Sequence, residues 1–138
     1  MNCSFIFYGS LKNVKLIKKI LKTSPTKRTL GFIKGYLYEV TDETEPNNIF
    51  KYPIVILDDN GLQISAWLTQ FTVSNNSLAV LKSRLNEFEG PLYEPKETTF
   101  YEVDGKKSKG IVFVAKSSVI IGECKNIKKI VSQIDVNY

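Results

Sequence analysis

Two short stretches of this sequence combine residue types that can bind an anion and move a proton. The first is Tyr8-Gly9-Ser10-Leu11, which directly follows an apolar, aromatic run typical of a buried strand. Successive backbone N–H groups in a turn after a strand can form a concave anion site, and glycine lets a ligand approach because it has no Cβ. An α-carboxylate would fit such a site. The residue pattern alone favours the other interpretation, a purely structural turn.

The second stretch ends a segment with the apolar spacing of a helix. Leu81 and Leu85 fall on one helical stripe, and Glu89 then lies in the last turn, before a Gly90-Pro91 stop. The C-terminal end of a helix is electrically negative and disfavours an anion. If the Glu89 side chain also turns into an apolar pocket, loss of solvation raises its pKa, as a general acid/base working near neutral pH requires. Composition alone favours a solvated glutamate beside Glu87.

The composition limits the kinds of site that the chain can build. It has no histidine and two isolated cysteines, Cys3 and Cys124. The lack of histidine removes the common zinc sites, the Ser/His and Cys/His nucleophile pairs and any imidazole base. We expect both thiols to be reduced, and a disulfide between them is the open alternative.

Length and charge indicate a globular protein. A chain of 138 residues with 43% hydrophobic residues is most simply one domain over residues 1–138, able to bury a core without a metal or disulfide. The net charge is +5, and lysines cluster at residues 12–22, 106–109 and 125–129. Solvated surfaces explain these clusters better than nucleic-acid binding, because no nucleic-acid-binding motif accompanies them. No stretch approaches membrane-spanning length, so we expect a cytoplasmic protein.

The elements that must position the two stretches alternate between strands and helices. Apolar and alternating runs predict strands at residues 4–8, 31–40, 52–57, 62–73, 98–103 and 110–115. Helical spacing predicts helices that start near Asn13 and near Asn75, and a terminal helix over residues 126–134. The second of these helices should bury Leu78 and Phe88 together with its two central leucines.

The connections between these elements predict the fold class. Residues 41–48 are acidic and polar and are expected to be a loop, whereas residues 58–61 (DDNG) carry a strong hairpin signal. The order β-α-β-β-β-α-β-β-α predicts an α+β domain on a mixed or antiparallel sheet that curls toward a barrel.

The order and spacing of the motifs resemble the γ-glutamylcyclotransferase-like proteins, above all the γ-glutamylamine cyclotransferase and AIG2-like branch. The matching motifs are YGSL after the first strand, then GYLYEV and YPIV, then NEFEG followed by a tyrosine. The resemblance covers about residues 4–115 and leaves a C-terminal extension, residues 117–138, without a match. It implies a compact mixed β-barrel with flanking helices and a pocket between the YGSL turn and a single essential acid.

The resemblance also implies the roles of individual residues. Glu89 stands at the position of the essential acid and is the expected catalytic residue. The expected substrate-binding residues are Tyr8, Gly9, Ser10, Leu11 and Tyr93. Two positions depart from the pattern. Asn86 replaces a usual aspartate, so an amide would have to supply any help in holding the loop, and Lys12 replaces a common arginine or asparagine.

The reaction that the resemblance implies is the cyclisation of a γ-glutamyl amine or γ-glutamyl amino acid. The substrate's α-amine attacks its own γ-carbonyl, 5-oxoproline forms, and the amine is released, with Glu89 as general acid and base. This chemistry needs no cofactor and no metal. The expected partner is a small γ-glutamyl substrate, with no nucleic acid and no membrane.

Two other interpretations stay open. The first is a non-catalytic protein that binds a small metabolite in the same pocket. The second is a nucleic-acid- or protein-binding module that uses the lysine-rich helix faces, with an affinity that falls steeply with salt.

Overall fold

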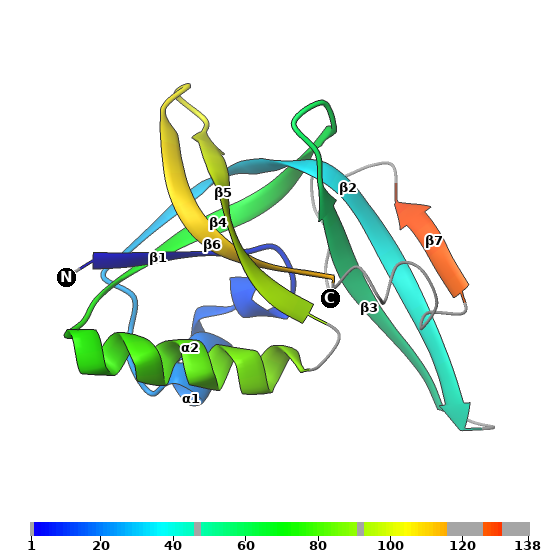
Figure 1. Ribbon diagram of the computed structural model, residues 1–138, viewed down its shortest axis with the longest axis horizontal. Helices are drawn as coiled ribbons and strands as arrows, with labels where there is room; N and C mark the ends of the chain where they lie inside the picture. The colour runs from blue at the N-terminus through cyan, green and yellow to red at the C-terminus, as the bar shows by residue number, and fades with distance from the viewer. Residues whose placement is uncertain (1, 46–47, 91–92, 116–125, 131–138) are drawn as a thin grey trace.

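A curved sheet and two helices that cover one of its sides make up this computed structural model (Figure 1). The structure describes residues 2–45, 48–90, 93–115 and 126–130. Its elements are, in order, β1 (Asn2–Phe7), η1 (Ser10–Lys12), α1 (Val14–Leu21), β2 (Lys27–Glu45), β3 (Asn48–Leu57), β4 (Leu62–Thr72), α2 (Asn75–Glu89), β5 (Tyr93–Glu102), β6 (Lys107–Ala115) and β7 (Asn126–Ile130).

Within the described residues, five strands close into a barrel in the order β2-β4-β1-β6-β5. The barrel closes because Gly31 and Phe32 of β2 pair with Glu102 and Tyr101 of β5. The β1–β6 pairing is parallel, and the other pairings in the ring are antiparallel. This arrangement confirms the expected α+β class and the mixed β-barrel with flanking helices.

The turn at residues 58–61 joins two strands that do not pair with each other. β3 and β4 lie on opposite edges of β2, and Gly35 of β2 pairs with Leu57 on one edge and with Leu62 on the other. The chain therefore crosses over β2 at Gly35, where a Cβ on Gly61 would come within 2.6 Å of the Gly35 Cα. The tight turn is present, since the Gly61 N–H donates to the Asp58 carbonyl at 2.9 Å. The predicted hairpin pairing is wrong.

Two further predictions about elements are also wrong. Most of the expected loop at residues 41–48 extends β2 to Glu45 and β3 back to Asn48, and these two residues are register partners. Residues 126–130 form β7 instead of a helix, and they pair antiparallel with β2 over residues 37–41. The polar residues 41–45 pair with β3 on one edge of β2, and the lysine-rich residues 126–130 pair with β2 on its other edge. In both segments strand pairing overrides the local preference of the sequence. The rest of the expected terminal helix lies outside the described residues.

The helices begin and end close to where the sequence predicts. The Asn13 side chain caps α1 by accepting from the Lys15 N–H at 2.9 Å. Ser74, one residue before the expected start, caps the N-terminus of α2 by accepting from the Ser77 N–H. Gly90, with φ 84°, caps the C-terminus of α2 after its last residue. Leu78 is half-buried, but Phe88 is 39% exposed, so the apolar stripe stops before the last turn. None of the described helices is long and apolar enough to cross a membrane.

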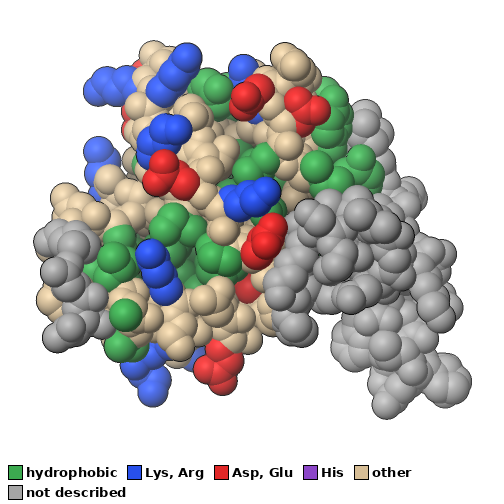
Figure 2. Space-filling model, in the orientation of Figure 1, with side chains coloured by type: hydrophobic (Ala, Val, Ile, Leu, Met, Phe, Trp, Pro, Cys, Tyr) green, Lys and Arg blue, Asp and Glu red, His purple; other side chains and the backbone are tan. Residues whose placement is uncertain are grey.

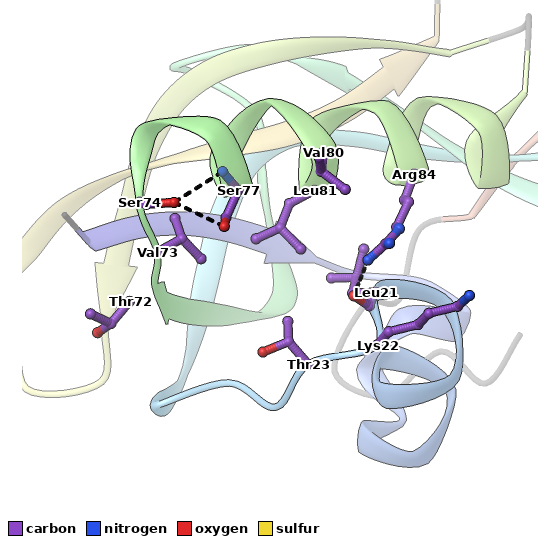
Figure 3. Close-up of a pocket in the computed structure, with 10 residues that line it drawn as sticks. All are labelled: Leu21, Lys22, Thr23, Thr72, Val73, Ser74, Ser77, Val80, Leu81 and Arg84. Atoms are coloured by element: carbon purple, nitrogen blue, oxygen red, sulfur yellow. Dashed lines mark hydrogen bonds between the residues drawn. The ribbon is translucent and has the colours of Figure 1, made fainter.

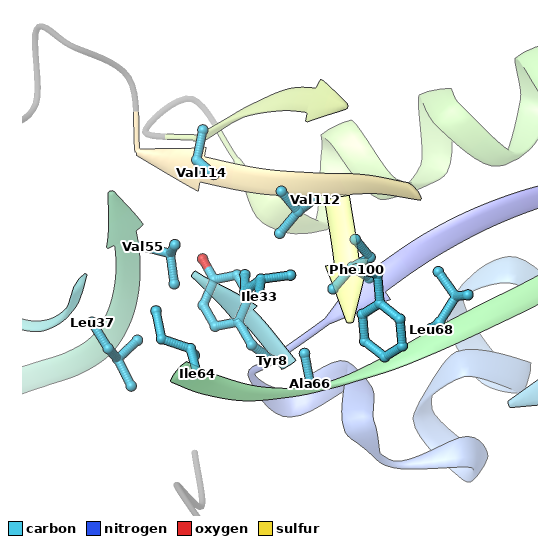
Figure 4. Packing of buried hydrophobic residues seen from close by; sticks show 11 residues of the cluster. Tyr8, Ile33, Leu37, Val55, Ile64, Ala66, Leu68, Phe100, Val112 and Val114 are labelled. Atoms are coloured by element: carbon cyan, nitrogen blue, oxygen red, sulfur yellow. The ribbon is translucent and has the colours of Figure 1, made fainter. Parts of the chain in front are cut away.

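Two hydrophobic clusters lie on the two faces of the barrel wall. Successive residues of a strand point to opposite faces, so Ile6 and Tyr8 belong to the cluster inside the barrel, and Phe5 and Phe7 to the cluster under the helices. Tyr8 thus enters the barrel interior (Figure 4). Cys3 is a buried free thiol in the helix-side cluster, and Cys124 lies outside the described residues.

Candidate functional site

Tyr8 directly follows β1 and is buried inside the barrel, with 7% of its surface exposed. Its hydroxyl donates to the Phe113 carbonyl of β6 at 2.8 Å. Burial raises the pKa of Tyr8 well above its ordinary value, the charges of Tyr93 and Glu89 raise it further, and a hydrogen bond from the backbone of Val55 opposes the rise. Tyr8 is therefore a neutral phenol, and it lies close enough to Glu89 and Tyr93 to interact with them electrostatically.

Glu89 is the last residue of α2 and is half-buried as a residue, with its carboxyl group largely enclosed by protein, whereas Glu87 is exposed. Burial raises the pKa of Glu89 to about 7, because the surrounding protein removes the water that would solvate its charge. A carboxyl group with this pKa is present both as acid and as base near neutral pH. The arrangement can therefore take up a proton and give it back.

Tyr93 begins β5 and joins it to β3. Its hydroxyl donates to the Pro53 carbonyl at 2.6 Å. Pro53 also faces the turn after β1, because a Cβ added to Gly9 would lie 3.6 Å from the Pro53 Cγ. Three parts of the chain that are distant in sequence thus meet at Pro53: the turn after β1, strand β3 and the start of β5.

The turn itself is closed by a hydrogen bond from the Lys12 N–H to the Gly9 carbonyl at 3.0 Å. The Leu11 side chain is 2% exposed and packs in the helix-side cluster, so only its backbone can face a ligand. The structure describes Ser10 as the first residue of η1, and its side chain is outside the described part.

Gly9 does not need to be glycine for conformational reasons. Its φ is outside the left-handed region, and a Cβ would make only an ordinary 3.6 Å contact with Pro53. Neither backbone strain nor packing therefore requires glycine at this position.

Sequence reasoning missed the groups that hold the two tyrosines and the turn. These are the backbone carbonyls of Pro53 and Phe113, the backbone of Val55, and Arg28, which donates to the Lys12 carbonyl at 2.6 Å. Backbone groups leave no residue-type signal. Arg28 lies 16 positions after its acceptor, the Lys12 carbonyl, and comes close to it only because β2 passes the turn.

Two hollows in the described part of the molecule are lined by none of the expected site residues. One of about 500 Å³ lies between the end of α1 and the first turns of α2 (Figure 3). In it, Arg84 of α2 donates to the Leu21 carbonyl at 2.7 Å. On the face seen in Figure 2, Lys and Arg side chains are interspersed with Asp and Glu. No group of three or more possible metal-ligating side chains occurs among the described residues.

No protein-family model and no curated protein matches the sequence. Among solved structures, a γ-glutamyl cyclotransferase aligns over 94% of this chain and 70% of its own length, with a TM-score of 0.61 and 11% identity. The chain has the γ-glutamylcyclotransferase-like fold. A protein from Arabidopsis thaliana known from its solution structure aligns over 83% of this chain, with a TM-score of 0.59 and 18% identity, and the chain spans 62% of that protein.

The same fold also occurs as a small part of a larger enzyme. An allophanate hydrolase from Kluyveromyces lactis aligns over 94% of this chain but only 19% of its own length, with a TM-score of 0.53 and 12% identity. At these identities the comparisons establish the γ-glutamylcyclotransferase-like fold, and an activity has to be argued from the residues of this chain.

Proposed function

We propose that this protein is a γ-glutamyl cyclotransferase that converts a γ-glutamyl amine or γ-glutamyl amino acid into 5-oxoproline and the free amine. One observation carries the proposal: Glu89 is a buried carboxyl with a pKa near 7 that interacts with Tyr8, the residue that leads into the Gly9–Lys12 turn. An acid/base group and a turn of backbone amides are the two parts that this reaction needs. The fold is also that of a γ-glutamyl cyclotransferase.

The turn and the tyrosines suit the two charged groups on the α-carbon of a glutamyl group. The backbone N–H groups of Gly9, Ser10 and Leu11 would receive the α-carboxylate. The hydroxyls of Tyr8 and Tyr93 donate their protons to backbone carbonyls. Toward a ligand these oxygens can therefore only accept, which suits the α-ammonium group.

Glu89 would move the proton in both directions. Its carboxylate takes a proton from the α-ammonium, and the freed amine attacks the γ-carbonyl carbon to close a five-membered ring. Glu89 gives this proton to the leaving nitrogen as its bond to that carbon breaks. The ring nitrogen then loses its second proton, which leaves with the released amine as an ammonium ion. Because nucleophile and electrophile belong to one molecule, the enzyme has mainly to hold the substrate in the attacking geometry. The proton transfers contribute about 10²–10⁴-fold.

The test is the release of 5-oxoproline from a panel of γ-glutamyl amino acids, γ-glutamyl-lysine and glutathione. Glu89→Gln keeps the size and polarity of the side chain but removes the proton acceptor, so it should lower kcat by about 10²-fold or more. Glu87→Gln is the matched control on the exposed side of the same helix turn and should keep wild-type activity.

Two outcomes would overturn the proposal. The first is full activity in Glu89→Gln. The second is a wild-type protein that binds one of these compounds without forming 5-oxoproline during long incubation. That result would favour a non-catalytic protein that binds a small metabolite.

A further inference from the structure

Arg28 lies beneath the turn after β1, at the start of β2. Its Nη2 donates to the carbonyl of Lys12, the last residue of η1, at 2.6 Å. Its Cζ lies 4.6 Å from the centre of the Trp67 ring, which is a cation–π contact. The guanidinium is thus held between the aromatic ring of a barrel strand and the backbone of the turn.

The strand register explains why these groups meet. Arg28 pairs with Thr69 of β4, and Thr69 pairs in turn with Phe5 of β1. In the same way Trp67 is the register partner of Phe7. Partners in an antiparallel pair point to the same face, so Arg28 and Trp67 lie on the outer face of the barrel, where Phe5 and Phe7 meet the helices. The turn and α1 rest on this face.

The environment of Arg28 is not optimal for stability. Burial lowers its pKa because the charged form loses solvation, although an arginine stays protonated in such a site. Its buried Nε has no hydrogen-bond partner among the described residues. A buried donor without a partner is unfavourable and calls for an explanation beyond packing.

We propose that Arg28, supported by Trp67, is a positioning residue that fixes the Gly9–Lys12 turn for binding of the substrate's α-carboxylate. Two hydrogen bonds hold the turn: the Lys12 N–H donates to the Gly9 carbonyl, and Arg28 donates to the Lys12 carbonyl. The first closes the turn on itself, and the second ties it to the barrel. The direction of the intervening amides then depends on Arg28.

This inference rests on the proposed function, and it predicts a specific kinetic signature. The turn would hold the α-carboxylate equally in the bound substrate and in the transition state. Loss of its anchor should therefore raise KM and leave kcat nearly unchanged. We expect Arg28→Gln to raise KM for a γ-glutamyl substrate about tenfold. Arg28→Lys should raise it less, because an ammonium can still donate to the carbonyl but cannot stack as a planar group on Trp67.

Arg84 provides a matched control in the same protein. Its guanidinium also donates to a backbone carbonyl, that of Leu21 at 2.7 Å, and the bond is also partly buried. It lies at the hollow between α1 and α2 rather than under the turn (Figure 3). Arg84→Gln should lower the melting temperature about as much as Arg28→Gln but leave KM within twofold of wild type.

Amide hydrogen exchange tests the same inference without activity. In Arg28→Gln the Lys12 amide should exchange at least tenfold faster than in wild type, and in Arg84→Gln at the wild-type rate.

Unchanged exchange and unchanged KM in both Arg28 variants would overturn the role of Arg28. An equal rise of KM in Arg84→Gln would also overturn it. A wild-type protein that forms no 5-oxoproline overturns the proposed function instead, and the exchange rates then decide whether Arg28 fixes the turn. Trp67→Phe, with a smaller ring, replaces Arg28→Gln if that variant does not fold, and should also speed exchange of the Lys12 amide.

Discussion

Glu89 and Glu87 lie two residues apart on α2 but in different environments. Glu87 projects into solvent, whereas the protein around Glu89 raises its pKa to about 7. At the scale of single residues, the environment of the carboxyl group therefore decides its role. Tyr8 is a second case, because burial keeps its hydroxyl neutral and directs it to a backbone carbonyl.

The raised pKa of Glu89 predicts the pH dependence of the reaction. Glu89 must be ionised to accept a proton from the α-ammonium, so kcat/KM for a γ-glutamyl substrate should increase as pH rises through about 7. The measurement is a pH–rate profile from pH 5 to 8. A profile that is flat from pH 5 to 8 would mean that Glu89 is not the base.

At the scale of elements, two glycines in turns have opposite reasons to be glycine. Gly61 lies where the chain crosses β2, and a Cβ there would come within 2.6 Å of Gly35 backbone atoms. Gly9 lies in the turn after β1, where a Cβ would make only a normal contact with Pro53. The first glycine is required by packing, and for the second we expect the missing side chain to leave space for a ligand.

This difference predicts opposite phenotypes for two alanine variants. Gly9→Ala should keep the free energy of unfolding within about 0.5 kcal/mol of wild type, as surface substitutions usually do. It should raise KM about tenfold, because the methyl group occupies the space beside the turn. Gly61→Ala should lower the free energy of unfolding by about 2–4 kcal/mol, because backbone atoms must move.

Urea denaturation and steady-state kinetics measure the two effects. The interpretation of Gly9 is wrong if Gly9→Ala loses as much stability as Gly61→Ala, or if it binds substrate as wild type does.

The elements could be predicted where the signal is local. The caps at Asn13 and Gly90 and the stripe through Leu81 and Leu85 place both helices correctly, and alternating runs locate the barrel strands. The failures concern pairing partners. Residues 41–45 extend β2 because β3 supplies their backbone partners, and residues 126–130 form a strand because they pair with β2. The turn at Gly61 joins strands on opposite edges of β2. No local pattern encodes a partner that is distant in sequence.

At the scale of the whole molecule, the fold brings Tyr8, which follows β1, within electrostatic reach of Glu89 at the end of α2, 81 positions later. The order of the motifs predicted this meeting through a resemblance, and the electrostatic interaction of Tyr8 with Glu89 agrees with it. The anchoring groups could not be predicted. Pro53 and Phe113 act through their carbonyls, and Arg28 reaches Lys12 only because β2 passes beneath the turn.

Burial of Glu89 should also make the stability of the whole molecule depend on pH. The folded-state pKa of about 7 lies above the ordinary value of 4.5, so the folded protein binds the proton more tightly than the unfolded chain. The free energy of unfolding should therefore fall as pH rises from about 4.5 to 7. For a largely buried carboxyl the loss is about 1–3 kcal/mol.

Glu89→Gln removes this titration. Its free energy of unfolding should change less between pH 5 and pH 8 than that of wild type, and at pH 8 the variant should be the more stable protein. Urea denaturation at the two pH values measures this difference. An equal loss of stability in wild type and variant would place Glu89 in solvent.

The most direct test of the account is 5-oxoproline formation by wild type and Glu89→Gln, at pH 7.5 with saturating γ-glutamyl substrate. We expect the wild type to release 5-oxoproline and the free amine in equal amounts. We expect the variant to bind the substrate but form product at least about 10²-fold more slowly. Product formation at the wild-type rate by a folded Glu89→Gln protein would contradict the central claim that this buried carboxyl moves the proton.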